Sequence, residues 1–144
     1  MQKIIFIVLL FLVKTSIAQK EPIERTWWNE EKTSKIQIFK SADGKFYGKI
    51  IFLQELNDTN GKPKTDKNNP SDQLKNRSII NLIILQNFVK SSHPNIYEDG
   101  AVYDPQSGKT YCGKLTFNGK ELKLRGYICG FSLLGRSAVW TLAD

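Results

Sequence analysis

The chain of 144 residues has very little of the equipment that enzymes use. It contains a single histidine, His93, which stands before Pro94 in a polar stretch. A histidine-rich zinc site is therefore excluded, and we interpret His93 as an exposed loop residue rather than as half of a catalytic dyad. No Cys-x-x-Cys pair occurs, so a thioredoxin-like redox function has no support.

Runs of like charge are also missing. The chain has 21 basic and 14 acidic residues, with a formal net charge of +7. The basic residues are scattered, and no block of about five or six occurs. We therefore interpret the surface as mixed and solvated, and we expect no nucleic-acid partner.

The sequence also lacks an apolar run long enough to span a bilayer. Residues 4–13 are apolar, but Lys3 and Lys14 flank them, and a spanning helix needs roughly twenty apolar residues. Ser16-Ile17-Ala18 ends this segment in the small residues of a cleavage site. We expect residues 1–18 to be a signal peptide cut after Ala18, with no transmembrane segment after cleavage. The protein is thus expected to be periplasmic or secreted.

Residues 19–144 form the expected single domain, which is long enough for one hydrophobic core. Within it, residues 54–76 are almost all turn formers or charged. We expect a long polar loop there, which is typical of a mobile or functional segment. Its carboxylates, Asp58, Asp66 and Asp72, suit a hard cation poorly, because lysines are interleaved with them. No metal and no cofactor are expected.

Short alternating segments separated by turns fill this domain. The expected strands cover residues 34–40, 45–53, 78–89, 101–103, 110–117, 120–129 and 136–142, while residues 19–26 are interpreted as a polar lead and residues 91–100 as a loop. The pattern predicts an all-β fold with little helix, a small antiparallel β-barrel built from consecutive hairpins. Closure is favoured because it removes exposed sheet edges.

The first hairpin is expected around Ala42-Asp43-Gly44, where glycine accepts a positive φ. Ile38 then pairs with Gly48 and Ile36 with Ile50. Phe46 and Phe52 would share their inward face.

The second clear hairpin signal is Asn118-Gly119, which would pair Phe117 with Lys120. Cys112 then lies opposite Arg125, roughly 13 Å along the ribbon from Cys129. A disulfide needs Cα atoms within about 7 Å. An even cysteine count in an exported chain favours a bridge, but this register argues against one.

The inward faces of these strands supply candidate ligand contacts. They carry Ile36, Ile38, Phe46, Phe52, Tyr111 and Phe117. Two interpretations stay open: these side chains fill the barrel, or they leave a pocket for one apolar ligand.

Several blocks together resemble a known family. They are Trp27, Ser34–Phe39 with Asp43–Ile50, Asp66-x-x-Asn69-Pro70, Tyr103-Asp-Pro-x-x-Gly-Lys-Thr-Tyr111, Leu124–Tyr127, and Gly135-Arg136 ahead of Trp140-Thr141. The chain is similar over its mature length to the domain of unknown function 2147 family. This resemblance implies export in Gram-negative bacteria and a lipocalin-like barrel, but it implies no activity.

The resemblance also implies structural roles. Lipocalin-like barrels often open with Gly-x-Trp, whose tryptophan packs at the closed end beneath an arginine. This chain keeps Trp27, with Arg25 at the glycine position, and either Arg125 or Arg136 could stack on it or simply lie at the surface. Trp140 is a further structural residue. The turn at Asp104, Pro105 and Gly108 fits type I geometry.

These patterns favour an exported, non-enzymatic protein that holds a small apolar or amphipathic ligand in or at the mouth of a barrel. The alternative is a filled barrel that binds an envelope component or protein through its surface, with residues 54–76 in the contact. A hydrolase using Glu98, Asp99 and Asp104 is the weakest hypothesis, because the turn with Pro105 explains Asp104 better.

Overall fold

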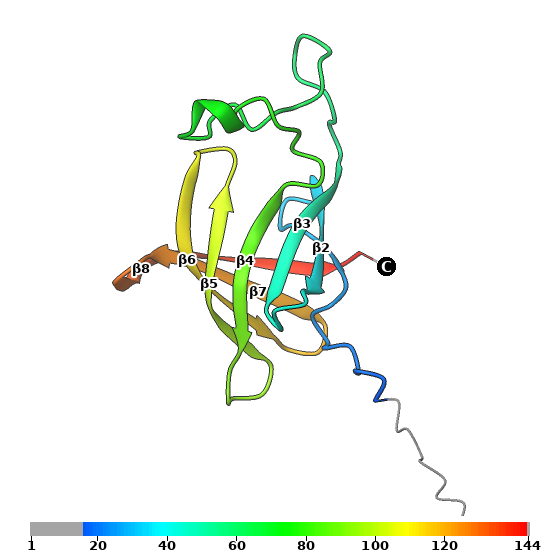
Figure 1. Cartoon of the computed structure of the whole chain (residues 1–144), viewed down its shortest axis with the longest axis vertical. Helices are drawn as coiled ribbons and strands as arrows, with labels where there is room; N and C mark the ends of the chain where they lie inside the picture. Colours follow the sequence, from blue (N-terminus) through cyan, green and yellow to red (C-terminus); the bar gives the residue numbers. More distant parts are fainter. Residues whose placement is uncertain (1–15, 144) are drawn as a thin grey trace, which may run out of the picture.

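A computed structural model describes residues 16–143, and these residues form one closed antiparallel barrel (Figure 1). Its strands are β1 (Thr26–Trp28), β2 (Ser34–Lys40), β3 (Phe46–Leu53), β4 (Ile83–Lys90), β5 (Ile96–Asp104), β6 (Lys109–Phe117), β7 (Glu121–Ile128) and β8 (Phe131–Leu142). A short 3-10 helix, η1 (Asp72–Leu74), lies in the loop between β3 and β4. Each strand pairs with its neighbour in sequence, and β1 closes the ring on β8. The all-β barrel prediction is confirmed.

Three strands begin five residues away from their expected first residues. β4 begins at Ile83, so residues 78–82 extend the long loop. The segment expected as a loop at residues 91–100 contains the start of β5, because Asn95 takes a positive φ of 64° and turns the chain tightly. β8 begins at Phe131 rather than Arg136.

Most of the expected signal peptide lies outside the described residues, so its cleavage stays a prediction. Within residues 16–143, no helix is long and apolar enough to cross a bilayer.

The first hairpin has the expected register, with Ile38 paired to Gly48 and Ile36 to Ile50. A bulge then intervenes, so that Lys35 pairs with Phe52. The bulge turns the Phe52 side chain outward, where it is 40% exposed and packs edge-on against Trp28. The prediction that Phe52 faces the interior is wrong, because one extra residue reverses the alternation of a strand.

The second hairpin is displaced by two residues from the expected register. The Asn118 side chain accepts hydrogen bonds from the amides of Lys120 and Glu121, and the Asn118 amide donates to the Glu121 carbonyl. Phe117 therefore pairs with Leu122 instead of Lys120. Since a shift by two residues preserves the alternation, the inward faces stay as predicted.

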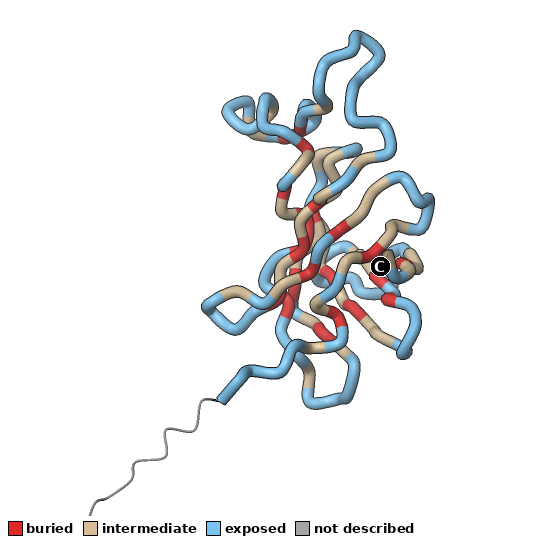
Figure 2. The backbone as a smooth tube through the Cα atoms, turned by 90° about the vertical axis from the view of Figure 1, so that its right-hand side faces the viewer, coloured by how far each residue is buried: buried red, intermediate tan, exposed pale blue. Residues whose placement is uncertain are grey.

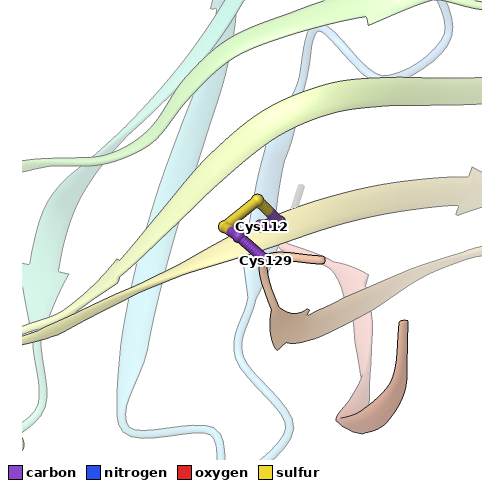
Figure 3. The surroundings of a disulfide bond; sticks show 2 residues. All are labelled: Cys112 and Cys129. Carbon is purple, nitrogen blue, oxygen red and sulfur yellow. A yellow bond between two sulfur atoms is a disulfide. The ribbon is translucent and has the colours of Figure 1, made fainter. Parts of the chain in front are cut away.

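The same shift explains a disulfide that the sequence argued against. Cys112 pairs with Tyr127, and Cys129 lies in the turn that follows β7 (Figure 3). The two cysteines are bonded, with their Cα atoms 5.1 Å apart. The expectation of an unbridged pair is wrong, because it used a register that placed Cys129 too far along the ribbon.

The core is densest at one end of the barrel, which we call the closed end. The Phe88 side chain lies against Gly100 and Gly113, where an added Cβ would come within 2.4 Å and 2.7 Å of its ring. Phe46 and Tyr97 meet edge-on nearby, with ring centroids 5.1 Å apart. The buried backbone follows the strands, whereas the loops are exposed (Figure 2).

The N-terminal segment covers this closed end. Ile23 is completely buried, and its carbonyl accepts a hydrogen bond from the Trp27 indole at 3.0 Å. Glu21 accepts hydrogen bonds from the Tyr97 hydroxyl at 3.0 Å and from Lys90. The expected polar lead is therefore a plug that uses both an apolar and a charged side chain.

Candidate ligand-binding site at the open end of the barrel

A cavity of about 730 Å³ opens at the opposite end of the barrel. Its floor consists of apolar side chains that the strands point inward: Ile36, Ile50, Leu53, Ile84, Val102, Leu124 and Trp140. Its size lies in the range of small-molecule pockets, and an apolar interior with a polar entrance is the usual design of such sites. The barrel is therefore not filled along its whole length.

The entrance to this cavity is polar and carries more carboxylates than amines. Glu31, Glu55, Asp58 and Asp104 line it together with Lys64 and Lys67. Lys64 forms an ion pair with Glu55 at 3.6 Å, which leaves Lys67 as the amine without a carboxylate partner among the ion pairs of the described residues. The electrostatics of this rim favour a neutral or cationic polar group over an anionic one.

The long loop above the cavity is attached to the barrel through Asp66. This carboxylate is completely buried and accepts hydrogen bonds from the Tyr103 hydroxyl at 2.5 Å, from Arg77 Nε at 2.8 Å and from Asn69 at 2.9 Å. Arg77 also lies over the Tyr103 ring, 5.9 Å from its centroid. Both carboxylate oxygens of Asp66 accept hydrogen bonds, and no buried side-chain polar atom of the described residues lacks a partner, so the cluster is a structural anchor rather than a set of free catalytic groups.

The environment of the Tyr103 hydroxyl disfavours its ionised form. Burial raises the pKa of Tyr103, and the hydrogen bond to Asp66 raises it further. The hydroxyl therefore remains a donor at all physiological pH values, and its bond to Asp66 persists.

A second attachment joins the loop to the turn between β5 and β6. The Asn68 side chain donates to the carbonyl of Gln106 at 2.7 Å and to that of Pro105 at 3.3 Å. Gly108 has a φ of +72°, and a Cβ there would lie 1.9 Å from the Asn68 carbonyl oxygen. Only glycine allows this turn and this close approach together. The sequence blocks around Asp66 and Tyr103 are therefore in direct contact.

The predicted ligand contacts are divided between the two ends. Ile36 lines the cavity, whereas Ile38 and Phe46 are buried in the core and do not line it. Phe117 packs against that core at the closed end, and Tyr111 is half-buried beside Val102. The role of the predicted contact residues in ligand binding stays a prediction.

The predicted structural residues are placed as follows. Trp27 is completely buried and meets Phe117 edge-on, with ring centroids 6.1 Å apart. No cation contacts its ring among the cation–π pairs of residues 16–143. Arg125 is half-buried and instead donates to the Ser132 carbonyl, and Arg136 is exposed.

The turn at Asp104 forms as expected. Its carboxylate accepts from the Gln106 amide and the Ser107 hydroxyl, and its carbonyl accepts from the Gly108 amide. Asp104 and Pro105 also lie at the rim of the cavity. Glu98 and Asp99 do not line it, and the described residues hold no cluster of three or more histidine, cysteine, aspartate or glutamate side chains suited to a metal.

Sequence reasoning missed most of the cavity floor. Ile84, Val102 and Leu124 were not among the predicted contacts, and Trp140 was assigned only a structural role. Inward alternation could have identified Leu124 beside Leu122. Val102 could not be found so easily, because a bulge in β5 places Asp99 at a positive φ of 60° and resets the alternation.

Comparison with known proteins agrees with this architecture. Residues 26–142 match the model of a family described as uncharacterised protein conserved in bacteria, DUF2147. The solved structure of protein HP1028 from Helicobacter pylori, described as belonging to the lipocalin family, is 25% identical, with a TM-score of 0.71 over 85% of this chain and 83% of that one. No curated protein matches.

Proposed function

Because the chain belongs to the DUF2147 family and folds as a lipocalin-like barrel, we propose that it binds a small amphipathic molecule in the open-end cavity. The observation that carries this proposal is the volume of about 730 Å³ left over an apolar floor. A barrel that acts only through its surface gains nothing from such a space. A cavity under about 300 Å³ would have been too small for a typical ligand.

The ligand chemistry follows from the two halves of the site. An aliphatic or aromatic part of the ligand would contact the floor around Ile50, Ile84 and Trp140. A neutral or cationic end would lie at the rim, where carboxylates outnumber amines. The proposed activity is non-enzymatic, because the buried polar groups at this end, Asp66, Asn69 and Tyr103, hydrogen-bond one another. With the expected signal peptide, the place of action would be the cell envelope.

The test compares two amphiphiles of equal chain length, an alkyltrimethylammonium and an alkyl sulfate, by calorimetry below their micelle concentrations. The protein is purified after export from a bacterial host. We expect the cation to bind about tenfold more tightly than the anion, which corresponds to about 1.4 kcal/mol. Native mass spectrometry of the same sample would reveal a ligand retained from the cell.

A pair of matched substitutions locates the binding. Leu53→Trp places a large ring at the cavity wall, whereas Leu56→Trp places it on an exposed part of the loop outside the cavity. We expect the first to weaken binding about tenfold or more and the second to leave it unchanged. Equal affinity in both variants, or no binding of either amphiphile, would refute the proposal.

A further inference from the structure

The hairpin formed by β7 and β8 ends in an apolar tip, residues 128–134. Four large apolar side chains there are strongly exposed: Ile128 at 50%, Phe131 at 64%, Leu133 at 93% and Leu134 at 59%. The beginning of β8 projects away from the barrel wall (Figure 1). Single exposed apolar residues are common on soluble proteins, but a group of this kind marks an interaction site.

The backbone holds this hairpin tip outward. Tyr127 pairs with Gly135 but Ile128 pairs with Phe131, so residues 132–134 bulge from β8 without partners on β7. Arg125 donates to the Ser132 carbonyl at 2.7 Å, and the disulfide ties Cys129 to β6. These two attachments keep the apolar side chains from folding back on the wall.

The chain around the hairpin tip is strongly basic. Residues 105–143 contain six basic residues and a single acidic one, Glu121, and both Lys120 and Glu121 lie at the end of β7 away from the tip. Lys114 and Arg125 are direct cross-strand partners, and Lys123 lies two positions before Arg125 on the same face of β7. None of the ion pairs in residues 16–143 involves these three side chains.

We propose that the hairpin tip inserts into the surface of an anionic phospholipid bilayer. Phe131, Leu133 and Leu134 would enter the boundary of the acyl chains, and Lys114, Lys123 and Arg125 would contact lipid phosphates. Apolar anchors with neighbouring cations are the combination that binds such surfaces. A second copy of this chain fits less well, because it would bring an identical basic face against this one. This contact is separate from the cavity and does not depend on its ligand.

The experiment is co-sedimentation with vesicles of phosphatidylglycerol and phosphatidylcholine in equal parts, and with vesicles of phosphatidylcholine alone. The exported protein is used, and its mass confirms that residues 1–18 are gone, because that apolar segment would bind lipid by itself. We expect binding to the anionic vesicles at least about tenfold stronger than to the neutral ones, with a loss as salt rises.

Two variants and one control assign the binding to the hairpin tip. One double variant, Phe131→Ser with Leu133→Ser, removes two apolar side chains. The other, Lys114→Gln with Lys123→Gln, removes two cations. Each double variant should reduce binding about tenfold or more. Leu74→Ser removes an exposed apolar side chain from the loop and should change nothing. All substituted side chains are at least partly exposed, so circular dichroism should show folded variants.

The possible results separate the occupants. Wild-type binding that survives in the Phe131→Ser, Leu133→Ser variant overturns the proposal. Failure of the wild-type protein to bind anionic vesicles would also overturn the proposal and would point to a protein partner. A wild-type dimer in size-exclusion chromatography that becomes monomeric in this variant would instead assign the hairpin tip to a second copy.

Discussion

The two ends of the barrel are closed by different kinds of interaction. At the closed end, the exposed fractions of Phe88, Trp27 and Tyr97 are 1% or less, and Ile23 from the N-terminal segment belongs to the same core. At the open end, the loop between β3 and β4 is held by hydrogen bonds to Asp66 and Asn68, over a cavity of about 730 Å³. The closed end is a packed apolar core, whereas the open end is a hydrogen-bonded loop above a cavity.

This difference has an energetic and a functional consequence. Apolar packing is non-directional and each large buried ring contributes several kcal/mol, so the closed end dominates stability. Individual hydrogen bonds contribute about 1 kcal/mol each, so we expect the loop to open at a lower free-energy cost than unfolding of the strands. An entrance that opens locally suits a ligand site, and a plug that does not open suits the base of that site.

The largest expected effect comes from Phe88→Ala at the closed end. The substitution leaves a cavity beside Gly100 and Gly113, which have no side chains of their own to fill it. We expect a loss of about 3–5 kcal/mol in the free energy of unfolding, measured by urea denaturation.

The matched change at the open end is Ile84→Ala. Ile84 already borders the cavity, so its truncation enlarges an existing space instead of creating a closed one. We expect a smaller loss, about 1–2 kcal/mol. Equal losses at the two positions would mean that the two ends are packed alike, which contradicts the comparison.

The sequence was sufficient to predict the closed end in outline. Alternation in residues 34–53 gave the register of the first hairpin, and a shift of two residues in the second left Leu115 and Leu122 facing inward. Local patterns carry this information because every second residue of a strand must enter the core. The role of Ile23 was missed, since one apolar residue in a polar segment has no period.

The open end depends on contacts between distant residues, and these lack a local pattern. Asp66 and Tyr103 are 37 positions apart, and nothing in either neighbourhood predicts their hydrogen bond. The bulge before Phe52 also reversed the face on which that side chain was expected. The disulfide was misjudged for a related reason, because the Asn118 turn moved the register by two residues.

The next largest effect is expected from Asp66→Ala, which removes the central acceptor of the loop anchor. Tyr103 then lacks its buried partner, whereas Arg77 is partly exposed and reaches water. We expect a loss of about 2–3 kcal/mol, below that of a fully buried ion pair. Hydrogen exchange should quicken in residues 64–79 and stay slow in β6 and β7.

Asp66→Asn is the control for this prediction. The amide keeps the shape and an acceptor oxygen but loses the charge, so exchange in the loop should rise less than in Asp66→Ala. A uniform increase over all strands in either variant would show that the loop anchor supports the whole barrel and not only its open end.

A smaller effect is expected from Gly108→Ala. Position 108 combines a positive φ with the close Asn68 carbonyl, whereas Gly44 has a similar φ of +81° and open space around it. We expect about 2 kcal/mol of destabilisation at Gly108 and about 1 kcal/mol at Gly44. Thermal unfolding measures both. Equal losses would mean that the contact between the loop and the turn contributes nothing.

The smallest expected effect concerns the charged part of the plug at the closed end. The hydrogen bond from Lys90 lowers the pKa of Glu21 below its usual 4.5, and the bond from Tyr97 lowers it further. The folded state therefore binds this proton less readily than the unfolded chain. The stabilisation is present above pH 4.5 and is lost as the pH falls through the lowered pKa of the folded state.

Lys90→Met should remove most of that acid-sensitive contribution. Because the Lys90 side chain is half-exposed, we expect no more than about 1 kcal/mol at neutral pH. The measurement is the free energy of unfolding between neutral pH and about pH 3 in wild type, Lys90→Met and Lys109→Met, whose lysine is exposed and forms no ion pair in the described residues. The Lys90 variant should show the shallower acid dependence. Identical pH curves for all three proteins would mean that the Lys90–Glu21 pair does not stabilise the closed end. Apolar packing would then account for that end, in sharper contrast with the polar open end.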